Sequence, residues 1–118
     1  MSSSREKSPA VTAVLASLAA GESPQRPALR EAVRALLLEL AAAAPGRSVE
    51  VRVPPFGAIQ CVAGPRHTRG TPANVVEMDP VTFVELSAGR LGWADAVRDG
   101  RISASGIRAD ISYLFPIH

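Results

Sequence analysis

The sequence predicts an α+β fold in which a small, mainly antiparallel sheet is covered by helices on one face. Apolar residues recur with helical spacing in some segments, and they alternate with polar residues in others. Glycine and proline stand where each pattern lapses. Together these observations give the order α-α-β-β-β-α-α-β-α along 118 residues, a length typical of one domain with one core.

The first segment with helical spacing runs from Pro9 to Ala20. Its apolar face consists of Val11, Val14, Leu15 and Leu18. Ser8 suits an N-cap and Gly21 a stop. Basic residues before this run also resemble a signal peptide, but the spacing favours a helix. Residues 1–8 are therefore predicted to be disordered, and residues 9–118 are predicted to form a single domain.

A second, longer helix is predicted from Pro27, which suits a first turn, to about Ala44, before Pro45-Gly46. Its apolar face consists of Leu29, Val33, Leu36, Leu37 and Leu40. Leu38 falls near the polar side of this helix. It is expected either at the rim of the core or at an interface.

Three strands follow the second helix. Residues 49–53 alternate valine with charged residues, which is typical of a half-buried strand, and Pro54-Pro55 ends it. A second strand is predicted over Ala58–Val62. A loop over Gly64–Pro72 then leads to a third strand over Asn74–Met78.

Three glycines divide the last third of the chain into four further elements. These are a helix that starts at Asp79-Pro80, a short helix with Trp93, a strand over 102–105 and a closing helix over Ile107–Leu114. The closing helix is expected to present Ile107, Ile111 and Leu114 on one face and to act as a lid.

The stretch "MDPVTFVELSAGRLGWADAVRDGRISASGIRADISYL" resembles the C-terminal half of the sterol carrier protein family. The Asp-Pro helix start, the "GR" after the first short helix and the "GRISASG" strand match that family in kind. The resemblance covers most of the chain from Pro27 onward. Abundant alanine and arginine, and a middle segment unlike the eukaryotic carriers, favour a bacterial, actinobacterial-type member.

This resemblance implies non-catalytic binding or transport of a fatty acyl chain, a sterol or a similar apolar molecule in a cavity between helices and sheet. The apolar residues expected to line it are Leu36, Leu40, Phe83, Leu86, Trp93, Val97, Ile107, Ile111 and Leu114. In the loop, Arg66, His67 and Arg69 either contact a carboxylate or headgroup or only keep a solvated loop soluble. The alternative function is a protein-interaction or accessory module with a filled core and no ligand, which would use Leu38 or the first helix.

Other classes of function find little support in the sequence. Cys61 is the only cysteine, which excludes an internal disulfide, and a lone cysteine on an apolar strand is typical of a core residue. Its spacing from His67 and His118 matches no metal site, and no cofactor motif is present. Scattered arginines and a net charge of +2 argue against nucleic-acid binding. No apolar run approaches a membrane span, so we do not expect an integral membrane protein. We expect a cytoplasmic protein that is not an enzyme.

Overall fold

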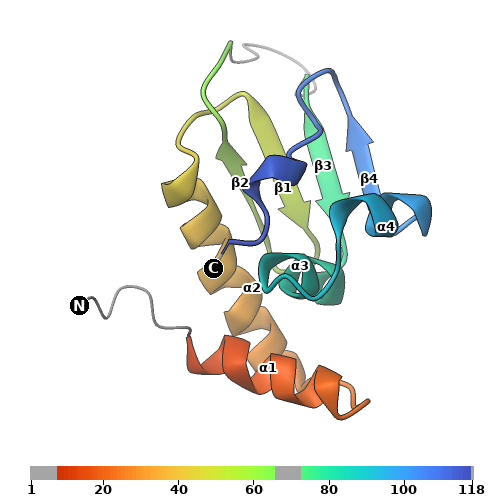
Figure 1. The fold of residues 1–118 in the computed structure, drawn as a ribbon. Helices are drawn as coiled ribbons and strands as arrows, with labels where there is room; N and C mark the ends of the chain where they lie inside the picture. Colours follow the sequence, from red (N-terminus) through yellow and green to blue (C-terminus); the bar gives the residue numbers. More distant parts are fainter. Residues whose placement is uncertain (1–7, 66–72, 118) are drawn as a thin grey trace.

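A computed structural model describes residues 8–65 and 73–117 of the chain (Figure 1). Its elements, in chain order, are α1 (Pro9–Ala19), α2 (Arg26–Ala43), β1 (Val49–Val53), β2 (Gly57–Cys61), β3 (Val75–Met78), α3 (Pro80–Ser87), α4 (Trp93–Arg98), β4 (Ile102–Ser105) and the 3₁₀ turn η2 (Ser112–Leu114). The predicted order of helices and strands is confirmed, with a 3₁₀ turn as the last helical element.

The four strands form one sheet in the order β2-β1-β3-β4. β1 pairs with β2 and β3 pairs with β4 in antiparallel fashion, whereas β1 and β3 are parallel. The sheet is therefore mixed but mainly antiparallel, as predicted. Its register places Val51 beside Ile59 on one side and beside Val76 on the other.

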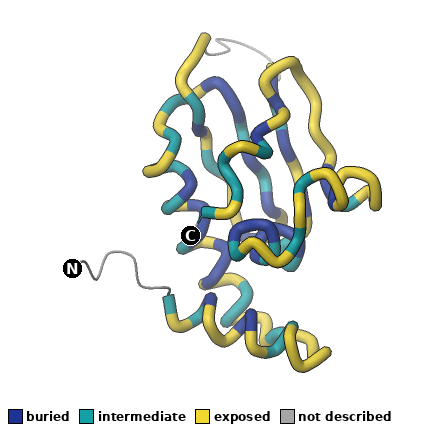
Figure 2. Tube along the Cα trace, in the orientation of Figure 1, coloured by how far each residue is buried: buried dark blue, intermediate teal, exposed yellow. Residues whose placement is uncertain are grey.

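Helices cover one face of this sheet. In Figure 1, α2, α3 and η2 lie on the same side of the strands. The valines of β1 point to this side and are buried, while Glu50 and Arg52 between them are only partly covered (Figure 2). The outer face instead carries an ion pair between Glu50 and Arg52, with 3.1 Å between Oε2 and Nε. The core therefore lies between the helices and the inner face of the sheet.

Two predicted helix starts are confirmed by their capping bonds. The Ser8 hydroxyl accepts a hydrogen bond from the Ala10 amide at 3.1 Å, and α1 begins at Pro9. The Asp79 carboxylate accepts one from the Thr82 amide at 3.1 Å, and α3 begins at Pro80. Such bonds satisfy amides that have no partner within the helix.

The segment after β4 differs from the prediction. Ile107 is 98% exposed, and only Ser112–Leu114 form a helical turn, so the prediction of a closing helix that begins at Ile107 is wrong in its extent. Gly106 has a φ of +111°, and the Arg108 amide donates a hydrogen bond to the Asn74 side chain at 2.9 Å. This bond to the residue before β3 fixes a turn where a helix was expected.

Candidate functional site

Most of the residues that the sequence suggests as a cavity lining lie in the closed core. Those with no exposed surface are Leu36, Leu40, Phe83, Leu86 and Ile111. Trp93 and Leu114 are partly buried and pack against them. The Phe115 ring lies edge-on to Phe83 at 6.3 Å and stacks on Trp93 at 6.0 Å between centroids. A ligand among these residues would have to displace well-packed side chains, and their contact with a ligand stays a prediction.

Two of the suggested lining residues lie on the surface instead. Val97 is 46% exposed, because α4 has fewer than two turns and buries only Ala96. Ile107 is exposed because of the turn at Gly106. The suggested headgroup contacts Arg66, His67 and Arg69 lie outside the described residues.

An apolar groove of about 290 Å³ runs between α2 and the edge strand β2. It is lined by Arg34, Leu37, Leu38, Phe56, Gly57, Ala58 and Ile59. The two walls approach each other at Gly57, where an added Cβ would lie 3.2 Å from Cδ1 of Leu37. Leu38 is 69% exposed at the rim. The volume is close to the lower end of small-molecule sites, at roughly 300 Å³, so the groove would hold part of a lipid chain.

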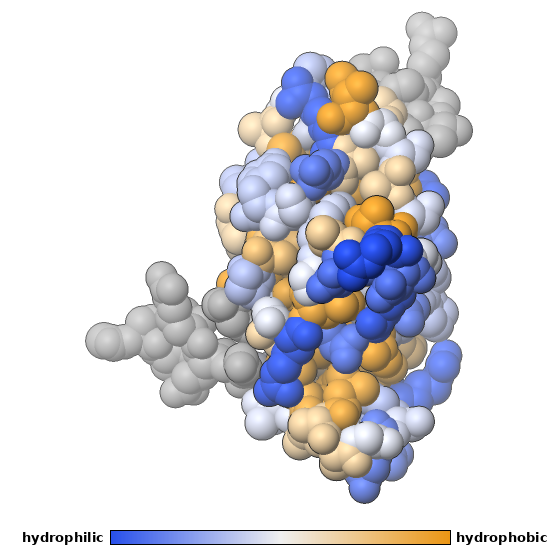
Figure 3. Space-filling model, turned by 45° about the vertical axis from the view of Figure 1, so that its right-hand side comes forward, coloured by the Kyte–Doolittle hydropathy of each residue, from blue (hydrophilic) through white to orange (hydrophobic). Residues whose placement is uncertain are grey.

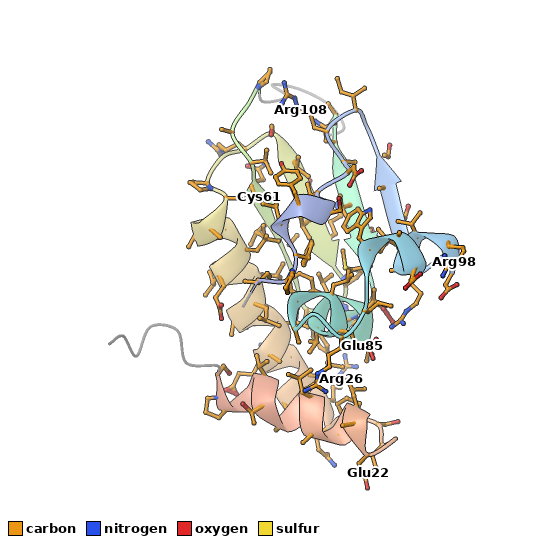
Figure 4. The ribbon with its side chains drawn as sticks, in the orientation of Figure 1. Glu22, Arg26, Cys61, Glu85, Arg98 and Arg108 are labelled. Carbon is orange, nitrogen blue, oxygen red and sulfur yellow. The ribbon has the colours of Figure 1, made fainter. Side chains whose placement is uncertain are left out.

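Two arginines of α2 contact Phe56, which lines the groove. Nε of Arg34 donates to the Phe56 carbonyl at 3.4 Å. The Arg26 guanidinium lies 5.1 Å from the centroid of the Phe56 ring, a cation–π distance, and Figure 4 places Arg26 where α2 meets α1. The groove therefore combines apolar walls with a cation at its edge.

Cys61 is a core residue, as its position on an apolar strand indicates. Its side chain has no exposed surface, and burial raises the pKa of the thiol to about 11. A nucleophilic cysteine needs the thiolate, which this environment disfavours at neutral pH. Among residues 8–65 and 73–117, no group of three or more His, Cys, Asp or Glu side chains is placed to hold a metal ion. Within the same residues, no helix has the length and apolar character of a membrane span.

The groove was missed by the sequence analysis. Arg34 and Phe56 are not among the ligand contacts that the sequence suggests. The available signal was Leu38, an apolar residue four positions after Arg34 and therefore on the same side of α2. An apolar residue outside the apolar face that the helix turns to the core indicates apolar surface that the core does not cover.

These features define a small α+β domain, with helices on one face of a four-stranded sheet and an apolar groove beside its edge. Residues 25–117 match a family model described as "Bacterial SCP ortholog". The match spans most of the chain, which therefore belongs to this bacterial family of sterol-carrier-like proteins. None of the curated proteins compared with the chain matches it.

Proposed function

We propose that this protein binds a lipid or another apolar small molecule non-covalently in the groove between α2 and β2. The family supports an apolar ligand in general terms. The groove itself supports the location, because Leu37, Leu38 and Ile59 present apolar side chains to one shared space. The observation that carries the proposal is the 69% exposure of Leu38 at the rim, since covering such surface is favourable by about 25 cal/mol per Å².

A fatty acyl chain with its carboxylate near Arg34 fits this groove best. Each methylene that is buried contributes about 0.8 kcal/mol, and an arginine at the edge favours an anionic head. Because the groove is small and open, only part of the chain is covered, and the costs of association and ordering remove several kcal/mol. We therefore expect affinity in the micromolar range or weaker, which suits a carrier that must release its ligand.

The test is titration of the purified protein with a fluorescent fatty acid. Leu38→Asn removes apolar surface at the rim and Arg34→Gln removes the cation, so each is expected to weaken binding roughly fivefold to tenfold. Val97→Asn and Arg90→Gln are the matched controls, because both residues are exposed and neither lines the groove. If all four variants bind equally well, the groove is not the site.

The interior residues suggested from the sequence, such as Phe83 and Trp93, define a second proposed place for the ligand. Binding there would require α3 or the segment around Phe115 to move away from the core.

We propose no catalytic role, and burial of Cys61 supports this. The cytoplasmic location also remains a prediction.

Exposure of Leu38 also favours the alternative function, an accessory module whose partner protein fills the groove with its own apolar side chain. Native mass spectrometry of the purified chain separates the two functions. Lipid that co-purifies at near-stoichiometric level supports the carrier. A bare mass, together with no binding of added fatty acid, supports the module.

A further inference from the structure

Ile107 is a large apolar side chain that the fold holds out into solvent. It is 98% exposed and lies in the turn after β4. Figure 4 shows the next residue, Arg108, at the opposite end of the molecule from α1. Figure 3 shows a hydrophobic group next to hydrophilic side chains at the upper end of the surface. A single exposed isoleucine is ordinary on a protein surface, but the backbone on both sides of Ile107 is anchored and a cation lies beside it.

The residues on both sides of Ile107 are anchored. The Asn74 side chain is buried, accepts a hydrogen bond from the Arg108 amide at 2.9 Å and donates one to the Ser48 carbonyl at 2.8 Å. Before Ile107, Gly106 packs against Asn74 so closely that a Cβ would overlap it. Because the turn is tied to the residues that precede β3 and β1, the fold fixes the backbone at Ile107.

Beside Ile107 lie the cation Arg108 and a hollow with a largely apolar lining. Arg108 forms no ion pair with any described residue, and its guanidinium lies over Gly64, where an added Cβ would be 3.2 Å from Nη1. Pro65 and Ala73 line the same hollow of about 420 Å³. The nearby Asp110 carboxylate accepts the Ser112 amide at 3.1 Å, a bond that leaves its negative charge in place.

We infer that this tip, formed by Pro65, Ala73 and residues 106–108, docks the protein on the surface of an anionic lipid bilayer. Ile107 would enter the region between headgroups and acyl chains, while Arg108 would meet anionic headgroups. A partner protein fits less well, because a stable interface needs roughly 800 Å² on each side with a clustered apolar centre. The tip instead offers one projecting apolar side chain beside the cation Arg108.

The first test is co-sedimentation of the full chain with vesicles of phosphatidylcholine that contain phosphatidylglycerol. We expect weak binding that is lost in pure phosphatidylcholine and at high salt. Ile107→Ser is expected to lower the partition coefficient about tenfold, and Arg108→Gln roughly fivefold. Arg108→Gln keeps the backbone amide that bonds to Asn74.

Val97→Ser and Arg90→Gln are the matched controls, because they remove an exposed apolar residue and an exposed arginine elsewhere. They are expected to bind vesicles like the wild type. Equal vesicle binding by Ile107→Ser and the wild type, or no binding by the wild type, would overturn the inference. The affinity of Ile107→Ser for fatty acid, measured without vesicles, should equal that of the wild type. The experiment therefore distinguishes a failure of the membrane-docking inference from a failure of the proposal that the groove binds the ligand.

A second test reports directly whether position 107 inserts into the bilayer. Ile107→Cys can be labelled selectively with an environment-sensitive nitrobenzoxadiazole dye, because Cys61 is buried. We expect a blue shift of its emission with phosphatidylglycerol-containing vesicles and no shift with pure phosphatidylcholine. An unchanged spectrum in the presence of sedimenting protein would show that another surface binds the vesicles and would contradict the inference.

Discussion

The thiol of Cys61 lies at the end of β2 with none of its surface exposed. Burial disfavours the charged thiolate, which raises the pKa of this group to about 11. In the unfolded chain the same thiol titrates near pH 8.5. The folded state therefore retains a proton that the unfolded state has lost between these two pH values.

This difference predicts a loss of stability in alkaline solution. The contribution of the thiol is fully present below about pH 8.5 and falls as pH rises to about 11, by about 3 kcal/mol in the free energy of unfolding. Urea denaturation at a series of pH values measures it. The control is Cys61→Ala, which is less stable at neutral pH but lacks this part of the decline. If the free energies of unfolding of the two proteins fall in parallel as pH rises, the decline does not come from the Cys61 thiol.

At the scale of elements, the turn from α2 to β1 is tied to the end of β2. The Val62 amide donates to the Ala44 carbonyl at 2.7 Å, and the Val62 carbonyl accepts bonds from the Ser48 amide at 3.1 Å and from its hydroxyl at 2.7 Å. Val62 has a φ of 68°, which is costly for a β-branched residue. Gly46, with a φ of +149°, lies directly against this backbone.

Replacing Gly46 should therefore be severe. In Gly46→Ala the new Cβ would overlap the Val62 carbonyl, so we expect a loss of at least about 3 kcal/mol in the free energy of unfolding. Gly100→Ala is the matched control, because Gly100 also has a positive φ, +73°, but nothing lies within 4 Å of its Cβ position. Its expected cost is about 1–2 kcal/mol, from backbone conformation alone. Equal costs in urea denaturation would show that the contact with Val62 is unimportant.

Local patterns were sufficient to predict most elements of this fold. Alternating valines predicted β1, and Asp79-Pro80 predicted the start of α3 with its capping bond. The turn at Gly106 was not predictable, because it depends on Asn74, 32 positions earlier in the sequence. The groove was not predictable either, because Leu38 and Ile59 meet only through the packing of α2 beside β2.

At the scale of the whole molecule, three surfaces have different characters. The outer face of the sheet is polar, with Glu50 paired to Arg52. The groove between α2 and β2 is apolar with an arginine at its edge. The tip around Ile107 projects from the end of the sheet opposite α1. A carrier needs a place to hold its ligand and a place to meet the membrane that supplies it, and the groove and the tip are our proposals for these two roles.

The most direct test of the central claim is a ¹⁵N–¹H correlation NMR titration of the full chain with palmitate. If the ligand occupies the groove, the largest shift changes will fall on residues 34–38 of α2 and 56–59 around β2. Amides near Phe83, Trp93 and Ile111 should then change little, because the core stays closed. Changes centred on those three residues would place the ligand in the interior and contradict the groove, and no changes at all would contradict lipid binding.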